Sequence, residues 1–346
     1  MQDFANILKE SIIITSFIFG MMILVEYFTV QTRDRFKKGI SKNKWMQVII
    51  GALLGIIPGC LGSYFAVTLY THNVLSFPAL TSVMIATSGD EAFAMLSLVP
   101  EKFLLINAIL FVVAIAAGFI LNLIYKNLNP YVKLNENLLK HHQRPQCYCF
   151  DKKNIWTNLK SLSFYRFILT IALIILLVLE ASGKIGPEKW YFRYALIGIF
   201  AFGLFVVITV PEHFLKDHIW KHIVVKHLAR IFLWIFVILL IIKIILPYLH
   251  ISEQTLRNFA SQYYWITLLI AVLLGIIPES GPHLVFVLMF SQGLIPMSIL
   301  IANSISQDGH GSLPLIAESG KSFLIMKAIN IFVALIIGLG LHLFGL

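Results

Sequence analysis

Two places in a strongly apolar sequence combine carboxylates with other groups that bind metal ions. Asp90 and Glu91 are adjacent in the first place, and Asp308 and His310 are separated by one residue in the second. Carboxylate and imidazole groups, supplemented by hydroxyl and amide oxygens, suit a hard or borderline divalent ion such as Mn²⁺. The residue types therefore predict a metal site formed by Asp90, Glu91, Asp308 and His310.

Further polar side chains near these two places extend the candidate site. The groups that we expect to contact the metal or its path are Glu279, His283, Gln307, Ser88 and Asn303, and weaker candidates are Cys60, Glu318, Thr87 and Ser280. Structural roles are open alternatives for several of these residues. Asp90 can cap the helix that follows it. Glu318 can pair with Lys321, and Cys60 can be a small apolar filler.

The cysteines limit the softer metals that the chain could bind. Cys60 is the only cysteine in an apolar segment, so this chain alone cannot build a trithiolate site for trivalent arsenic. Copper(I) also fits poorly, because it prefers soft sulfur ligands. Cys147 and Cys149 lie with His141 and His142 in a polar loop, which is a weak metal-binding pattern. A site rich in oxygen and nitrogen ligands is therefore the favoured interpretation.

The composition indicates which elements must position these groups. Hydrophobic residues make up 58% of the 346-residue chain, charged residues make up 13%, and the mean hydropathy is +0.84. Values this apolar predict an integral membrane protein built from helices. A helix needs about 20 apolar residues to cross a hydrocarbon core about 30 Å thick. Runs near this length occur at 11–30, 103–125, 163–181, 191–211, 230–249 and 323–344.

The net charge of +10 does not indicate a nucleic-acid partner. Basic residues gather in loops beside the apolar runs, at 31–44, 126–166 and 216–230, whereas the connections at 183–189 and 250–262 carry fewer. Cytoplasmic loops of membrane proteins are enriched in Lys and Arg. The first three loops are therefore predicted to be cytoplasmic, and the other two external.

The sequence contains an internal duplication. The segment Leu53-Leu-Gly-Ile-Ile-Pro58 recurs as Leu273-Leu-Gly-Ile-Ile-Pro278, 220 residues later, and the similarity continues to Gly118 and Gly338. Because the loop after the first span is basic in one copy but not in the other, the copies are predicted to have opposite orientations. The predicted organisation is a first repeat at 1–126, a polar loop at 127–162, two linking spans with their connection at 163–220, and an inverted second repeat at 221–346.

Glycine and proline interrupt the apolar segments of both copies. The predicted breaks are at Pro58, Gly59, Gly62, Gly89, Pro278, Gly281, Pro282, Gly309 and Gly311. Unsatisfied backbone is costly in lipid, so such breaks must be buried in protein or line a wet cavity. We expect about ten hydrophobic helical segments, with broken or re-entrant helices that meet at the membrane midplane. Ten complete spans are the alternative, but they would put the basic 127–162 loop outside.

Longer motifs around the breaks resemble a known family, the ten-transmembrane heavy-metal exporters. The similar motifs are Ile57-Pro-Gly-Cys-Leu-Gly62, Ala86-Thr-Ser-Gly-Asp-Glu-Ala-Phe93, Ile277-Pro-Glu-Ser-Gly-Pro-His283 and Gln307-Asp-Gly-His-Gly311. Members of this family are bacterial membrane proteins labelled manganese transporters or arsenic efflux proteins. The resemblance implies metal export across the bacterial cytoplasmic (inner) membrane. A more distant similarity to the arsenical permeases is weakened at Pro58-Gly-Cys-Leu-Gly62, where that family has two cysteines.

These observations predict a secondary active transporter rather than an enzyme. The sequence contains no Walker A motif, so ATP hydrolysis is not expected. Metal-binding carboxylates must lose their protons, which favours proton antiport. The expected function is export of a divalent heavy metal, Mn²⁺ above others, by alternating access of two repeats. The expected partners are the metal as transported substrate, protons and the lipid bilayer, with no cofactor and no nucleic acid, and a homo-oligomer is left open.

Three alternative functions are weighed against this one. An arsenite or organoarsenical efflux permease would use the same fold with a different cargo. A passive metal channel would use the same ligands without coupling. An intramembrane aspartyl protease would use Asp90 and Asp308 as its catalytic pair, but the companion Tyr-Asp motif is absent.

Overall fold

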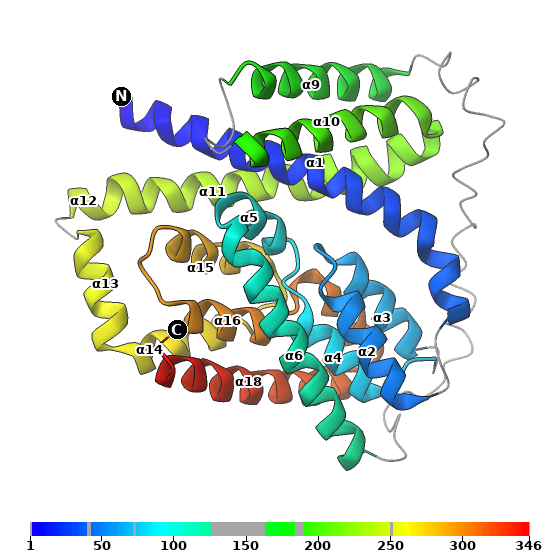
Figure 1. Cartoon of the computed structure of the whole chain (residues 1–346), viewed down its shortest axis with the longest axis vertical. Helices are drawn as coiled ribbons and strands as arrows, with labels where there is room; N and C mark the ends of the chain where they lie inside the picture. Colours follow the sequence, from blue (N-terminus) through cyan, green and yellow to red (C-terminus); the bar gives the residue numbers. More distant parts are fainter. Residues whose placement is uncertain are drawn as a thin grey trace. The chain divides into compact units, whose positions relative to one another are not determined.

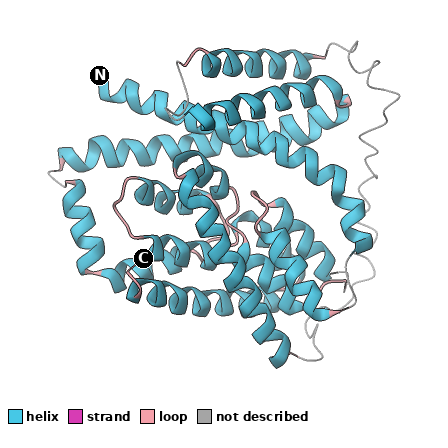
Figure 2. Cartoon of the chain, in the orientation of Figure 1, coloured by secondary structure: helices cyan, strands magenta, loops and turns pink. Residues whose placement is uncertain are grey.

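The computed structural model describes residues 2–39, 43–71, 74–125, 163–183, 190–249 and 252–345. Every regular element in these ranges is a helix, and no strand occurs in them (Figure 2). The predicted all-α class is therefore confirmed. The predicted polar loop at 127–162, with its cysteines and histidines, lies outside the described residues.

Among the described residues, five helices are long and apolar enough to cross a membrane. Their apolar stretches are Phe4–Phe28, Pro100–Ile124, Phe164–Ala181, Phe214–Ile245 and Gly320–Leu343. Shorter apolar helices are Lys44–Gly55, Leu196–Thr209, Tyr264–Leu274 and Gly281–Ser291. A helix of 11 or 12 residues is about 16–18 Å long, little more than half of a hydrocarbon core. The helices on either side of the duplicated motif are therefore of partial length, as the glycine and proline breaks predict.

The chain divides into two compact units. The first contains Met1–Lys37 and Asn137–Val237, and the second contains Lys38–Glu136 and Ile238–Leu346. All the duplicated broken helices, and all the site residues predicted from the sequence, belong to the second unit.

The first unit consists of long helices with few buried polar groups. Its helices are α1 (Gln2–Gly39), α9 (Phe164–Ala181), α10 (Trp190–Thr209), the π-helix η2 (Phe214–Leu228) and most of α11 (Ala229–Leu240). Helix α9 packs against α10 and η2. The buried Glu26 of α1 contacts Nδ1 of His218 at 2.7 Å, and Arg166 Nη2 donates to the carbonyl oxygen of Val210 at 2.8 Å. These charged groups therefore have polar partners inside the apolar unit.

The second unit contains the two copies of the broken-helix motif. The first copy is α2 (Lys44–Gly55), α3 (Leu61–Thr71), α4 (Phe77–Ala86), α5 (Glu91–Leu98) and α6 (Pro100–Ile124). The second copy is α14 (Tyr264–Leu274), α15 (Gly281–Ser291), α16 (Met297–Ser306), the 3₁₀ turn η4 (Gly309–Ser312), α17 (Leu313–Glu318) and α18 (Gly320–Leu343). The segments η3 (Ile241–Ile245), α12 (Leu246–Tyr248) and α13 (Glu253–Gln262) precede the second copy.

Two pairs of helices have the same boundaries in the two copies at the 220-residue offset. Helices α3 and α15 begin and end at equivalent residues, and so do α4 and α16. Two close glycine contacts are also repeated. A Cβ on Gly118 would lie 2.4 Å from Val48 Cγ1, and a Cβ on Gly338 would lie 2.7 Å from Leu268 Cδ1, at the position equivalent to Val48. The duplicated sequence therefore produces a duplicated fold.

Helices α4 and α16 form the centre of the unit, because all ten residues of each are buried. Helix α4 packs between α2 and α6, and α16 packs between α14 and α18. In Figure 1, α16 lies along α18. The half-helices after the breaks are exchanged between copies: α5 packs on α15, and η4 and α17 pack on α3. Reciprocal contacts of this kind are the mark of an approximate two-fold relation.

Replacing Gly338 with alanine should destabilise the protein. The added Cβ would lie 2.7 Å from Leu268 Cδ1 and 2.9 Å from Ala302 Cβ, so α18 must move away from α14 and α16. Overpacking of this kind costs about 1–3 kcal/mol, and the melting temperature of the detergent-purified protein should fall. Gly340 on the same helix is the control, since a Cβ there has open space. Gly340→Ala should leave stability unchanged or raise it, and equal destabilisation by both changes would contradict the packing described.

Candidate functional site

Four breaks in the helices bring irregular backbone into the centre of the second unit. The chain leaves helical conformation between α2 and α3, between α4 and α5, between α14 and α15, and between α16 and η4. Gly59, Gly89 and Gly309 in these breaks have positive φ angles of 94°, 55° and 52°. Only glycine adopts such angles at little cost. Gly89 and Gly309 are equivalent residues of the two copies, so the same sharp turn is used twice.

Direct contacts join breaks that are far apart in the sequence. The amide of Gly59 donates to the carbonyl oxygen of Gly89 at 2.9 Å, which links the two breaks of the first copy. Gln307 Nε2 donates to the carbonyl oxygen of Thr87 at 3.2 Å, which links the two copies. A Cβ on Gly89 would lie only 3.8 Å from the Cα of Gly309. The breaks therefore lie together, and the residues that follow them are neighbours.

Three metal-binding side chains meet at this junction. Cys60, Asp90 and His310 each offer one ligand atom, and these atoms all lie within 4.8 Å of one another. The thiol of Cys60 donates to Asp90 Oδ1 at 3.6 Å. Cys60 and Asp90 are buried, and His310 is half-buried. Ligands bonded to one tetrahedral ion at about 2.0–2.3 Å lie about 3.3–3.8 Å apart, so these groups need to approach by about 1 Å to bind the same ion.

Two residues of the α14–α15 break complete the surroundings of His310. Its Nδ1 lies 3.4 Å from Ser280 Oγ, and its Nε2 lies 3.1 Å from Glu279 Oε1. A second polar partner fixes the orientation of a ligating imidazole and increases its basicity. A Cβ on Gly309 would lie 3.3 Å from Cys60 Sγ, so the glycine lets the backbone approach the thiol closely. The sequence-predicted residues Asp90, His310, Glu279, Ser280 and Cys60 are thus brought together.

The duplication relates the members of this cluster in pairs. Cys60 is equivalent to Ser280, and Asp90 is equivalent to His310, at the 220-residue offset. Four equivalent positions therefore surround one place, but they carry four different side chains. We refer to Cys60, Asp90 and His310 as the central cluster.

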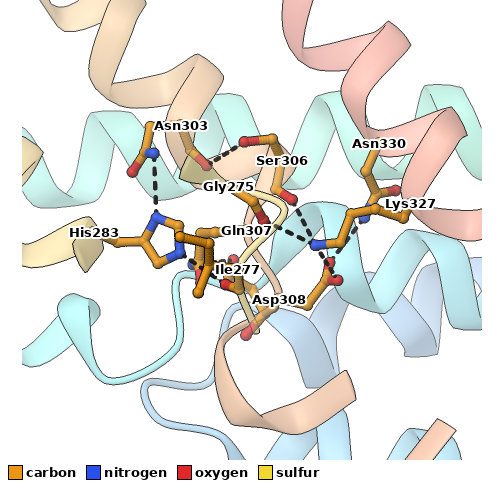
Figure 3. A network of polar contacts seen from close by, with 10 residues as sticks. Gly275, Ile277, His283, Asn303, Ser306, Gln307, Asp308, Lys327 and Asn330 are labelled. Carbon is orange, nitrogen blue, oxygen red and sulfur yellow. Dashed lines mark hydrogen bonds and ion pairs between the residues drawn. The ribbon is translucent and has the colours of Figure 1, made fainter. Parts of the chain in front are cut away.

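Asp308 lies in a different set of contacts, in spite of its closeness to His310 in the sequence. Its carboxylate is fully buried, and Oδ2 lies 2.5 Å from Nζ of Lys327 on α18. Asn330 Nδ2 donates to Oδ1 at 3.0 Å (Figure 3). The structure therefore places Asp308 in a buried ion pair rather than among the ligand atoms of the central cluster. Lys327 was missed in the sequence, although a lysine well inside an apolar span is itself a signal of a buried partner.

His283 and Asn303 also lie apart from the central cluster and connect three helices. Asn303 Nδ2 donates to the carbonyl oxygen of Ala271 at 2.7 Å and to His283 Nδ1 at 3.2 Å. His283 Nε2 donates to the carbonyl oxygen of Ile277 at 3.3 Å (Figure 3). Both ring nitrogens are thus used to hold α15 and α16 against α14 and the break that follows it.

The remaining candidates occupy the breaks without joining the ligand atoms of the central cluster. Glu91 is fully buried, and neither carboxylate oxygen has a hydrogen-bond partner among the described residues. Ser88 is likewise buried, and its hydroxyl has no partner within the same ranges. The Thr87 hydroxyl accepts from the amide of Gly89 at 3.3 Å. Glu318 is half-buried at the end of α17.

The comparison with protein families identifies the wider class. A family described as "Putative, 10TM heavy-metal exporter" matches residues 4–344. The chain belongs to this family. No curated protein and no solved structure matches the chain. The resemblance found in the sequence motifs is thereby confirmed for nearly the whole length of this heavy-metal exporter.

Family membership indicates the kind of cargo that the protein carries. The family consists of multi-pass membrane proteins described as heavy-metal exporters. The protein is therefore located in a membrane, and a metal ion is its transported substrate. Thiol, carboxylate and imidazole groups are the side chains that bind such ions. In this heavy-metal exporter they converge at one place within the described second unit, where the broken helices meet.

Cobalt(II) can test whether the central cluster binds a metal through its thiol. Co²⁺ bound to a thiolate gives a sulfur-to-metal charge-transfer band, which should appear when the purified protein is titrated. The Cys60→Ser variant should lose the band, whereas Ser280→Cys, which adds a thiol at the equivalent position, should intensify it. A Cys147→Ser/Cys149→Ser variant is the control and should retain the band. A band that survives in Cys60→Ser but disappears in this control would contradict the assignment.

Proposed function

We propose that this protein is a secondary active transporter that exports a divalent transition metal through the central cluster. The observation that carries the proposal is the convergence of Cys60, Asp90 and His310 within 4.8 Å, where the breaks of both copies meet. Substrate sites of transporters built from repeats are formed by such discontinuous helices. The side chain of Glu279 is 32% exposed and contacts His310, which supports a role for it at the entrance or exit of the proposed site.

The donor set supports a borderline metal as the cargo. The sequence alone favours Mn²⁺, because most of the predicted ligands carry oxygen or nitrogen. A thiolate together with imidazole and carboxylate suits Zn²⁺ better than Mn²⁺. We therefore place Zn²⁺ first and Mn²⁺ second. Trivalent arsenic is less favoured, since Cys60 is the only cysteine in the described part of the chain.

The fold supports alternating access as the mode of transport. The exchanged half-helices, α5 on α15 and α17 on α3, give the two copies an approximate two-fold relation. The loop charges suggest that the two-fold axis lies in the membrane plane, which would make the repeats inverted. Rocking of one copy against the other would then expose the central cluster to each side in turn.

Proton exchange is the proposed source of energy. A metal binds the deprotonated thiolate, the carboxylate and the neutral imidazole, so protons compete with it for the same groups. Protons that enter from outside would release the metal there and then be carried inward. The buried carboxyl group of Glu91, next to Asp90 in the chain, is a second carrier for these protons.

Transport by reconstituted protein should depend on each member of the central cluster. Proteoliposomes with a metal-sensitive dye inside should accumulate Zn²⁺ faster than Mn²⁺. The variants Cys60→Ala, Asp90→Asn and His310→Gln should each lower the rate at least about tenfold, because a first ligand is lost. The Cys147→Ser/Cys149→Ser variant should transport normally. Wild-type rates in Asp90→Asn would remove the central cluster from the transport path.

A proton gradient should drive the metal against its own gradient. Vesicles with an acidic lumen should accumulate Zn²⁺ above the external concentration, and collapse of the gradient by a potassium–proton ionophore should abolish this accumulation. Preloaded metal should also stimulate uptake of labelled metal, as in any carrier. Uptake that only equilibrates, without such counterflow, would instead identify a passive channel.

A further inference from the structure

The buried ammonium group of Lys327 lies in a coordination shell of oxygen atoms. Its Nζ donates to the carbonyl oxygens of Gly275 and Ser306 at 3.0 and 2.9 Å, and lies 2.5 Å from Asp308 Oδ2 (Figure 3). Only 4% of the side chain is exposed. Two carbonyl oxygens and one carboxylate oxygen are the ligands that a small hard cation selects.

Both carbonyl groups belong to helices that end at a break. Gly275 caps the C-terminus of α14, and Ser306 is the last residue of α16. The last carbonyl groups of a helix lack intrahelical partners and carry the negative end of the helix dipole. In transporters with broken helices, such half-helix ends and unwound carbonyl groups coordinate monovalent cations. The side chain of Lys327 supplies a positive charge at a place of this kind.

The first copy has no such positive charge at the equivalent place. The residue equivalent to Lys327 is Asn107, whose Nδ2 donates to the carbonyl oxygen of Phe103 on its own helix at 3.0 Å. The residue equivalent to Asp308 is Ser88. The carboxylate and the ammonium group therefore occur together in one copy, and neither occurs at the equivalent positions of the other.

We propose that the oxygen atoms of Gly275, Ser306 and Asp308 form a monovalent-cation site that Lys327 fills with its own ammonium group. The tethered charge then takes the part of a bound sodium ion, so metal transport requires no Na⁺ or K⁺ from solution. The site also fixes the α16–η4 break, because Asp308 lies two residues before His310. The transport half of this inference rests on the proposed function, whereas the cation site itself does not.

Removal of the ammonium group should open this site to a cation from solution. The Lys327→Ala variant should melt at a lower temperature than the wild type in choline chloride. Addition of Na⁺ or methylammonium at constant ionic strength should raise its melting temperature saturably, by about 3 °C or more. The wild type should show no difference between Na⁺ and choline. Lys327→Met is the matched control, because its side chain fills the space without charge and should prevent rescue.

A second variant keeps the test decisive if Lys327→Ala does not fold. Lys327→Asn introduces the residue that the first copy carries at the equivalent position, and it should show the same stabilisation by Na⁺. Combining either change with Asp308→Asn should remove the cation effect. Melting temperatures of Lys327→Ala and Lys327→Asn that are identical in Na⁺ and choline would overturn the proposal.

Transport separates this inference from the proposed function. Zn²⁺ uptake by the wild type should be equal in Na⁺ and choline, whereas uptake by the Lys327→Asn variant should require Na⁺. If metal is transported but neither variant responds to Na⁺ in stability or uptake, the cation site is wrong and the exporter stands. If Na⁺ stabilises the variants but no metal is transported, the proposed function is wrong and the cation site stands.

Discussion

A helix that ends in the buried interior of a protein leaves amide and carbonyl groups that must find partners there, and the second unit is arranged around such groups. The amide of Gly59 bonds to Gly89, Gln307 bonds to the backbone of Thr87, and Lys327 bonds to the carbonyl groups of Gly275 and Ser306. Each partner comes from another break or another helix, so the breaks stabilise one another. The side chains that follow the breaks are consequently held close together, which is what a metal site requires.

Local chemistry explains what could be predicted from the sequence and what could not. Glycine and proline mark the breaks, and the 220-residue repeat gives the boundaries of the matching helices. Asp90 and His310 are predicted as ligands from the sequence, and Asp308 is grouped with them. Closeness in the sequence does not show in which direction each side chain points. Gly309, with a φ angle of 52°, turns the chain between Asp308 and His310, so the two side chains have different partners. A lysine inside an apolar span signals a buried partner, but its partners here, Asp308 and the carbonyl groups of Gly275 and Ser306, come from other segments and cannot be identified from its own sequence.

The two copies share a backbone but differ in the side chains at the junction. Strict symmetry would place carboxylates at both 90 and 310, within a few ångströms of each other, where like charges in a low dielectric repel strongly. An imidazole at His310 can bind a metal without adding negative charge, and the residue equivalent to Cys60 is Ser280, which carries a hydroxyl. Different side chains at equivalent positions thus convert a symmetric scaffold into a single asymmetric site.

The charges of the junction are consistent with coupling between metal and protons. The ion pair of Asp308 with Lys327 is neutral and tethered, so it contributes no net charge in any state of transport. In the proposed function, the two positive charges of the metal ion neutralise the thiolate of Cys60 and the carboxylate of Asp90. Two protons bound to the same groups neutralise them equally well. In the proposed alternating-access cycle, either of these neutral states could be buried, whereas the empty, deprotonated site would carry two negative charges through the apolar interior at high cost. On this proposal, a site that is occluded only when loaded with metal or with protons would exchange one for the other, and would thereby couple metal export to proton entry.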